Sequence, residues 1–165
     1  MKFGLFGAAT AQRSNNPDVD SAAGFKDYID YVCEAESLGY ESVFIVEHHF
    51  TGFGQVSATL NLLTWLGART TTLRLGTAVM VLPWYDPVRF AEDVAMLANL
   101  VQGPLHIGMG RGTAKLEYDA LRIPMSEARD RFLECWDITK LALSGKPFTY
   151  DGRFTKVERP ITVRP

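Results

Sequence analysis

The chain has 165 residues, enough for one ordinary domain with a hydrophobic core, and 47% of them are hydrophobic. Its 17 basic and 19 acidic residues nearly balance, which argues against a nucleic-acid partner. No apolar run approaches the roughly 20 residues that span a bilayer, and both cysteines fall in helical patterns. We therefore expect a cytoplasmic protein with no membrane partner and no disulfide framework.

The N-terminal region alternates strands with a helix. The apolar run Lys2–Gly7 predicts a strand, and a polar loop over Thr10–Asp20 follows it. Apolar residues recur at helical spacing over Phe25–Leu38, and Gly39 is placed to end that helix. The run Val43–Val46 then predicts a second, buried strand.

The same alternation continues through the middle of the chain. Ser57 is placed to cap a helix that ends near Arg69, and Leu73–Val79 predicts a third strand. Asp86-Pro87 marks the start of a third helix, because proline suits the first helical position. A fourth strand is expected over Leu105–Met109.

The C-terminal third is expected to hold a long connection, a helix over 126–144, and a hairpin over 148–163 that turns at Asp151-Gly152. Four strand–helix units in succession predict an α/β fold with a parallel sheet and right-handed crossovers. Two architectures fit: a small doubly wound sheet, or half of a (β/α)8 TIM barrel, which takes about 250 residues when complete. Residues 1–165 are treated as a single domain.

The polar cluster Glu47-His48-His49 follows the second strand directly, at the edge of a parallel sheet where ligands bind. An imidazole can exchange a proton near neutral pH, and a neighbouring carboxylate can fix its tautomer. The alternative is that one histidine packs beneath the loop while the other caps a backbone group. A metal site on His48 and His49 is disfavoured, because adjacent residues of an extended segment point in opposite directions.

Two further segments are candidates for ligand binding. In Gly108–Thr113, glycines let the backbone approach a ligand, and Arg111 between them can bind phosphate oxygens. In Gly76–Pro83, small residues leave room for a flat ligand against the third strand. The alternatives are a strand-ending turn with a surface arginine in the first case and ordinary core packing in the second.

At these residues the chain resembles the bacterial luciferase-like family of flavin-dependent monooxygenases. The matching segments are collinear and correctly spaced: Met1–Gly4, Glu47–Thr51, Gly76–Pro83, Asp86–Arg89 with Glu92-Asp93, and Gly108–Gly112. The resemblance implies a TIM barrel that holds reduced FMN at the carboxyl ends of its strands. The chain corresponds to the N-terminal half of that barrel, the first four β/α units with a C-terminal hairpin.

The resemblance also implies roles for individual residues. His48 takes the position of the catalytic histidine that supports the flavin C4a-peroxide, with Glu47 as its orienting partner. By the resemblance, the Ala78-Val79 bond is expected to be a non-prolyl cis peptide beneath the flavin ring, and Arg111 is expected to contact the flavin phosphate. The cofactor-binding positions that it implies are Ala78, Val79, Gly110, Arg111 and Glu117, with Gly110 standing where luciferase has a reactive cysteine.

The implied reaction oxygenates a small organic substrate with O2 and FMN that a separate NAD(P)H-dependent reductase has reduced, without a metal. Three alternatives stay open. The chain can be an oxidoreductase that uses coenzyme F420, as other family members do. It can be a non-catalytic half-barrel, with or without bound flavin, that forms a homo-oligomer through exposed sheet edges. A metal-dependent hydrolase built on the two adjacent histidines is the third.

Overall fold

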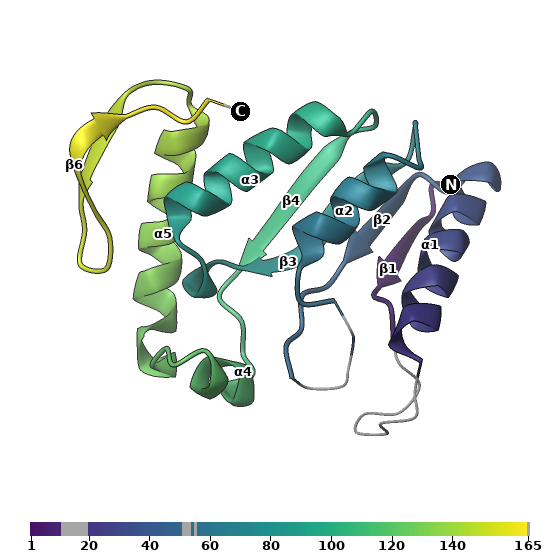
Figure 1. The fold of residues 1–165 in the computed structure, drawn as a ribbon, viewed down its shortest axis with the longest axis horizontal. Coiled ribbons are helices and arrows are strands. Elements are labelled where there is room, and N and C mark those ends of the chain that lie inside the picture. Colours follow the sequence, from purple (N-terminus) through teal and green to yellow (C-terminus); the bar gives the residue numbers. More distant parts are fainter. Residues whose placement is uncertain (11–19, 51–53, 55, 165) are drawn as a thin grey trace. The chain divides into compact units, whose positions relative to one another are not determined.

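The computed structural model describes residues 1–10, 20–50, 54 and 56–164 (Figure 1). They belong to two compact units, Met1–Met80 with Leu100–Met109 and Val81–Asn99 with Gly110–Pro165. In chain order the elements are β1 (Gly4–Gly7), α1 (Ser21–Ser37), β2 (Ser42–Ile45), α2 (Thr59–Gly67), β3 (Arg74–Val81), a 3₁₀ turn (Leu82–Trp84), α3 (Pro87–Leu100), β4 (Leu105–Gly110), α4 (Lys115–Ala120), a second 3₁₀ turn (Met125–Glu127), α5 (Ala128–Leu143), β5 (Phe148–Asp151) and β6 (Lys156–Ile161).

The first unit is built on a parallel sheet with strand order β1-β2-β3-β4. Ser42 of β2 lies opposite Gly4 of β1 and opposite Arg74 of β3, so these three strands start in register. This arrangement confirms the predicted α/β class and the four successive strand–helix units. Since the strands run the same way, the residues that follow β2 and β3 emerge at the same edge of the sheet.

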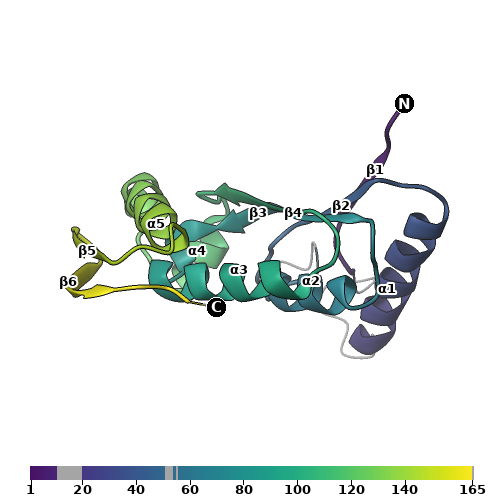
Figure 2. The same ribbon diagram turned by 90° about the horizontal axis from the view of Figure 1, so that it is seen from above.

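One face of this sheet is buried against helices. Val43 and Ile45 of β2 are completely buried, and Figure 2 shows α1 and α2 on the same side of the sheet. The helices contribute further completely buried residues: Val32, Leu63 and Leu66. Burial of each such side chain contributes about 1.5–3 kcal/mol, which holds the helices on this face. Side chains alternate along a strand, so Phe44 faces the other way and is only half-buried, and Phe6 of β1 is 72% exposed.

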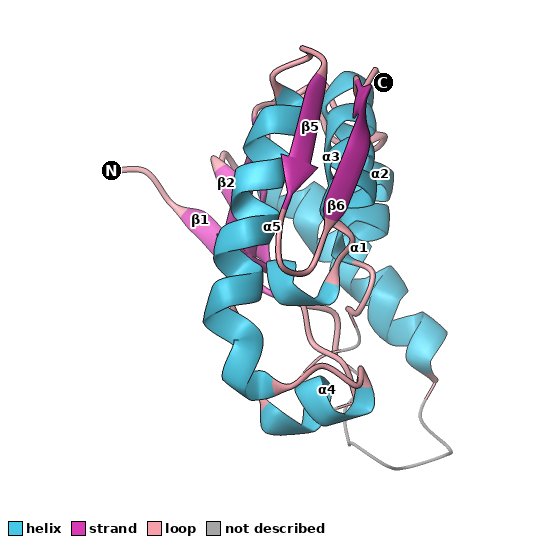
Figure 3. Cartoon of the chain, turned by 90° about the vertical axis from the view of Figure 1, so that its left-hand side faces the viewer, coloured by secondary structure: helices cyan, strands magenta, loops and turns pink. Residues whose placement is uncertain are grey.

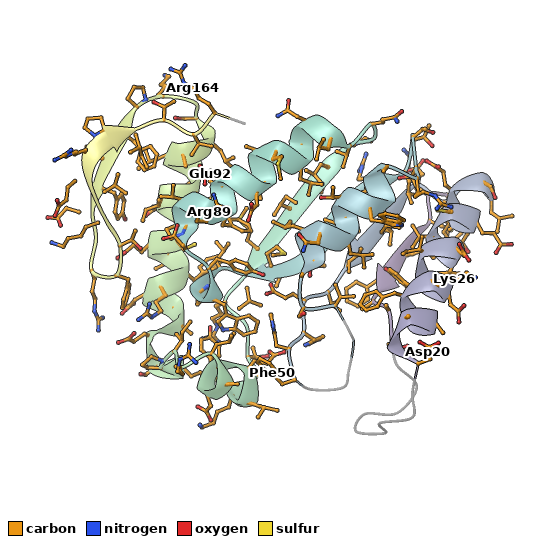
Figure 4. All side chains as sticks on the ribbon, viewed as in Figure 1. Asp20, Lys26, Phe50, Arg89, Glu92 and Arg164 are labelled. Atoms are coloured by element: carbon orange, nitrogen blue, oxygen red, sulfur yellow. The ribbon has the colours of Figure 1, made fainter. Side chains whose placement is uncertain are left out.

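Helix α1 begins at Ser21, earlier than the predicted Phe25. The Asp20 carboxylate accepts hydrogen bonds from the backbone N–H groups of Ala22 (2.9 Å) and Ala23 (3.2 Å) and therefore caps the helix (Figure 4). The apolar periodicity starts only at Phe25, which is why it placed the start too late. The predicted end is confirmed, because Gly39 follows the helix with a φ of 85°.

The predicted capping residues of two other helices, α3 and α2, can also be compared with the structure. The prediction that Asp86 caps α3 is confirmed, since its Oδ1 accepts from the N–H groups of Val88 (3.0 Å) and Arg89 (2.9 Å). The prediction that Ser57 caps α2 is wrong. That helix begins at Thr59, and the residue before it, Ala58, has no side chain that could cap it.

The second unit packs α5 against the C-terminal hairpin (Figure 3). Its buried cluster consists of Ala91, Ile138, Ala142, Phe148, Val157 and Val163. Strands β5 and β6 pair antiparallel, with Phe148 opposite Ile161, which confirms the hairpin. Asp151 lies opposite Lys156, so the loop begins at Gly152, and the N–H of Gly152 donates to the carbonyl of Thr155 at 3.0 Å. On α3, Arg89 forms an exposed ion pair with Glu92 at 2.5 Å (Figure 4).

In the part of the chain that the structure describes, no helix is both long and apolar enough to cross a membrane.

A carboxylate of α1 fixes the connection between α2 and β3. Oε1 of Glu36 accepts hydrogen bonds from the backbone N–H groups of Thr71 (2.9 Å), Thr72 (2.7 Å) and Leu73 (2.8 Å), and from the Thr72 hydroxyl (3.0 Å). Burial acts to raise the pKa of Glu36, but these four donors outweigh it, and the pKa is lowered. The ionised carboxylate is therefore part of the folded state.

We expect Glu36→Gln to reduce the free energy of unfolding at pH 7 by about 1–2 kcal/mol, as for the loss of a helix-capping carboxylate. Because the folded pKa lies below the unfolded one, the wild-type advantage is present at neutral pH and disappears as the pH falls below about 4.5. Urea unfolding at pH 7 and pH 3 measures both effects. Glu34→Gln, on the exposed side of the same helix, should change neither value, and an equal loss in that variant would contradict the assignment.

Candidate functional site

The Glu47-His48-His49 segment follows β2, separated from its last residue by Val46. The N–H of Val46 donates to the carbonyl of Gly7 at 3.1 Å, and the N–H of His48 donates to the carbonyl of Val56 at 3.0 Å. These two bonds hold the backbone on both sides of Glu47. The motif is therefore fixed at the carboxyl edge of the sheet, where the sequence predicted it.

Within this segment, Glu47 is 4% exposed although it is a charged residue, and its Oε1 lies 2.8 Å from Nε2 of His49. The sequence led us to expect Glu47 as the orienting partner of His48; that role stays a prediction. The contact with His49 was not anticipated. Both histidines are half-buried.

Phe50 ends the segment in an unusual conformation. Its φ is 61°, in the left-handed region that residues with a side chain rarely adopt. The ring is 65% exposed (Figure 4), and its centroid lies 5.7 Å from that of the His49 ring. Thr51, the last residue of the matching segment, and residues 11–19 of the predicted polar loop lie outside the described residues.

The end of β3 provides the second group of predicted residues. Ala78 and Val79 are half-buried and are joined by a cis peptide bond, as the resemblance implied. The Thr77 hydroxyl donates to the carbonyl of Gly108 at 2.8 Å and ties the ends of β3 and β4 together. A Cβ on Gly108 would collide with the carbonyl oxygen of Thr77, so this close approach of the strands requires glycine.

The glycine–arginine segment belongs to the second unit from Gly110 onward. Gly112 has a φ of 69°, and a Cβ there would lie 2.7 Å from Val81 Cγ1, so both conformation and space require glycine. Arg111 is exposed, and its carbonyl accepts a hydrogen bond from the hydroxyl of Tyr118 on α4. The backbone beneath the guanidinium is thus anchored while the side chain stays open to solvent.

Tyr118 itself is completely buried, and its ring meets Trp84 edge to face at 5.5 Å. Burial raises the pKa of Tyr118, against the opposite influence of the guanidinium groups of Arg111 and Arg131. The phenol therefore stays protonated and able to donate. Its neighbour Glu117, predicted to lie near the flavin, is 2% exposed, in the first turn of α4.

The structure thus groups the predicted residues in two sets. Glu47, His48, Ala78 and Val79 lie at the carboxyl edge of one sheet, whereas Gly110, Arg111 and Glu117 lie in the second unit. Sequence reasoning missed His49 as the partner of Glu47, and it missed Tyr118. A signal for Tyr118 was present in the helix-forming run that precedes it, which the prediction treated as part of a long connection.

The described residues also include the groups that a metal site or a cysteine nucleophile would use. No three His, Cys, Asp or Glu side chains within 1–10, 20–50, 54 and 56–164 gather closely enough to hold a metal ion. His106 on β4 is exposed and contacts the Phe44 ring. Both cysteines are free thiols, and burial raises the pKa of Cys135 to about 12, so its thiolate is scarce at neutral pH.

Comparison with known proteins gives a consistent result. The family model described as luciferase-like monooxygenase matches residues 1–165. The alkanal monooxygenase alpha chain of the Kryptophanaron alfredi symbiont is 35% identical over 150 residues, covering 88% of this chain and 40% of that protein. An uncharacterised protein of Sinorhizobium fredii is 33% identical over 157 residues, covering 95% and 44%.

Solved structures agree in fold. The monooxygenase RslO1 of Streptomyces bottropensis superimposes with a TM-score of 0.90 at 29% identity, covering all of this chain and 49% of that one. The oxygenating constituent of 3,6-diketocamphane monooxygenase from Pseudomonas putida, solved with FMN, gives a TM-score of 0.87 at 20% identity, covering 98% and 44%. The chain therefore spans less than half the length of these relatives and matches them as a partial barrel.

Proposed function

The chain belongs to the luciferase-like monooxygenase family, and from that premise we propose that it uses reduced FMN and O2 to oxygenate a small organic substrate. The observation that supports this most directly is that Glu47-His48 and Ala78-Val79 emerge at the same carboxyl edge of one parallel sheet. Ligands of such sheets bind at that edge. Reduced FMN, when bound, supplies the two electrons with which one atom of O2 is reduced to water while the other enters the substrate.

The residues that we assign to FMN fit such a group. Ala78 and Val79 are half-buried and carry small side chains, so a flat ring can lie against their backbone. The exposed guanidinium of Arg111 suits a phosphate dianion, because it can donate two parallel hydrogen bonds. We assign Gly110 to close approach of the cofactor and Glu117 to a polar contact with it.

His48 is assigned the reacting role. The residue is half-buried, and its backbone is fixed by the bond from its N–H to the carbonyl of Val56. In this position it donates or accepts a hydrogen bond at the oxygen that is being transferred and can move a proton there. Glu47 orients the histidine segment.

We also propose partners for the whole protein. A separate NAD(P)H-dependent reductase supplies the reduced flavin, and the chain works in the cytoplasm. The edge strands β1 and β4 each have one neighbour in the sheet, which makes them the expected contacts of a homo-oligomer.

The test compares His48→Ala with His106→Ala, a substitution of an exposed histidine on β4. We expect His48→Ala to lower the rate of substrate oxygenation about 100-fold or more, as for loss of an acid–base group. FMN binding, measured by fluorescence titration, should change little in either variant. Stopped-flow absorbance during reoxidation of the bound flavin should show a slow phase that shortens only in His48→Ala.

Three outcomes would contradict this function. If the wild-type protein binds no FMN, the result would favour the hypothesis of a non-catalytic half-barrel. Binding of F420 in place of FMN would favour the deazaflavin oxidoreductase. Equal activity of the two histidine variants would remove His48 from the chemistry.

A further inference from the structure

The segment after β2 contains a carboxylate–imidazole pair, and its second member, His49, has no role in the proposed function. The Glu47 side chain is fully buried, and its Oε1 lies 2.8 Å from Nε2 of His49, whose side chain is 16% exposed. A buried carboxylate is costly unless it is paired and hydrogen-bonded. A carboxylate oxygen accepts this bond from the tautomer of His49 that carries its proton on Nε2.

His48 lies between the two members of this pair. Side chains two residues apart share a side of an extended segment, and the side chain between them faces the other way. Contact between Glu47 and His49 fits this arrangement, while the N–H of His48 is held by the Val56 carbonyl at 3.0 Å. Fixing the pair therefore fixes the direction in which the Cα–Cβ bond of His48 points.

Phe50 closes the other end of the segment. Its backbone has a φ of 61°, in the left-handed region that is unfavourable for a residue with a side chain, so its surroundings must hold it. Among the described residues, the only aromatic ring in contact with Phe50 is that of His49. The two ring centroids lie 5.7 Å apart, with an interplanar angle of 44°. His49 is thus held by Glu47 and contacts the turn that ends the motif.

We propose that Glu47 and His49 act together as a positioning pair that aims His48, so that the two adjacent histidines have different duties. The second histidine anchors, and the first faces the reacting atoms. The inference rests on the proposed function for the role of His48, but the pair and its effect on the His48 ring can be tested without flavin.

The first test uses the three histidines of the chain as probes. Histidine labelled with ¹⁵N reports the tautomer of each ring by NMR, and His106 on β4 serves as the internal reference. Glu47→Met removes the acceptor with little change of volume and leaves no buried charge. Glu47→Gln keeps an acceptor, and Glu41→Met makes the same change at an exposed glutamate that pairs with Lys2.

In wild type we expect His49 to show one tautomer, with the proton on Nε2. Glu47→Met should give a mixture of tautomers and should also shift the His48 ring signals, whereas Glu47→Gln should restore both and Glu41→Met should match wild type. The proposal is overturned if the His49 tautomer does not depend on Glu47, or if His48 stays unchanged when that tautomer is lost. Should Glu47→Met not fold, the double variant Glu47→Met/His49→Leu replaces both partners by apolar groups, and the His48 shift is expected there as well.

The second test measures turnover with reduced FMN. In Glu47→Met the His48 ring loses its orientation, so we expect kcat to fall about tenfold or more. The FMN dissociation constant should stay within about twofold of wild type. Glu47→Gln should recover the rate. A loss of FMN binding with unchanged kcat would identify a binding role and overturn the positioning role. If wild type itself binds no FMN, the proposed function fails while the NMR result still decides the pair.

Discussion

Replacing Tyr118 by alanine is expected to lower the free energy of unfolding of the second unit by about 3–5 kcal/mol, the usual loss for truncating a fully buried aromatic side chain. The Tyr118 ring is completely buried and packs edge to face on Trp84 at 5.5 Å. Its removal would leave a cavity beneath the loop that carries Arg111. Urea unfolding followed by tryptophan fluorescence measures the change.

Tyr118→Phe separates the hydroxyl from the ring. This variant keeps the packing and loses the hydrogen bond to the Arg111 carbonyl, which is worth about 0.5–1.5 kcal/mol. Because the carbonyl then lacks its anchor, we expect Tyr118→Phe to weaken FMN binding more than its small stability loss suggests. Tyr31→Ala, at a tyrosine of α1 that is 53% exposed, is the control. If Tyr118→Ala loses no more stability than Tyr31→Ala, the buried Tyr118 side chain does not stabilise the second unit as proposed.

The sheet and its order were accessible from the sequence because short apolar runs and helix-ending residues alternate regularly. The run Val43–Val46 identified a strand that is indeed buried on one face, and Asp86-Pro87 located the start of α3 to the residue. Such signals are local: a buried strand needs consecutive apolar residues, and a cap needs its own side chain. Where the signal was weaker, as at Asp20, the predicted boundary was displaced to the first apolar residue.

The parts that escaped prediction depend on contacts between distant residues. Helix α4 is only six residues long, and its buried Tyr118 contacts Trp84, which lies far away in sequence. The bond from Glu47 to His49 needs a particular backbone course that the pattern of residue types does not fix. The motif after β2 therefore revealed where a site lies, but not which histidine the carboxylate holds.

Glu134→Ala is expected to cost about 2–3 kcal/mol, because one carboxylate on α5 holds the turn of the C-terminal hairpin. Its Oε2 accepts from the N–H of Arg153 (2.8 Å), and its Oε1 accepts from the N–H groups of Phe154 (2.9 Å) and Thr155 (2.6 Å). The Phe154 ring also lies 4.2 Å from the guanidinium of Arg131. Without the carboxylate, three N–H groups of the turn lose their acceptor at once.

The two oxygens of Glu134 make a graded test possible. Glu134→Gln can keep the bonds at Oε1 but presents an amide N–H₂ toward the N–H of Arg153, so it should lose less stability than Glu134→Ala. Hydrogen exchange should then rise at residue 153 alone in Glu134→Gln, and at 153, 154 and 155 together in Glu134→Ala. Glu158→Ala, at an exposed glutamate of β6, should stay within about 0.5 kcal/mol of wild type. Uniform exchange across the turn in all three variants would mean that the hairpin holds its own conformation, and that α5 and the hairpin associate through their apolar cluster rather than through this carboxylate.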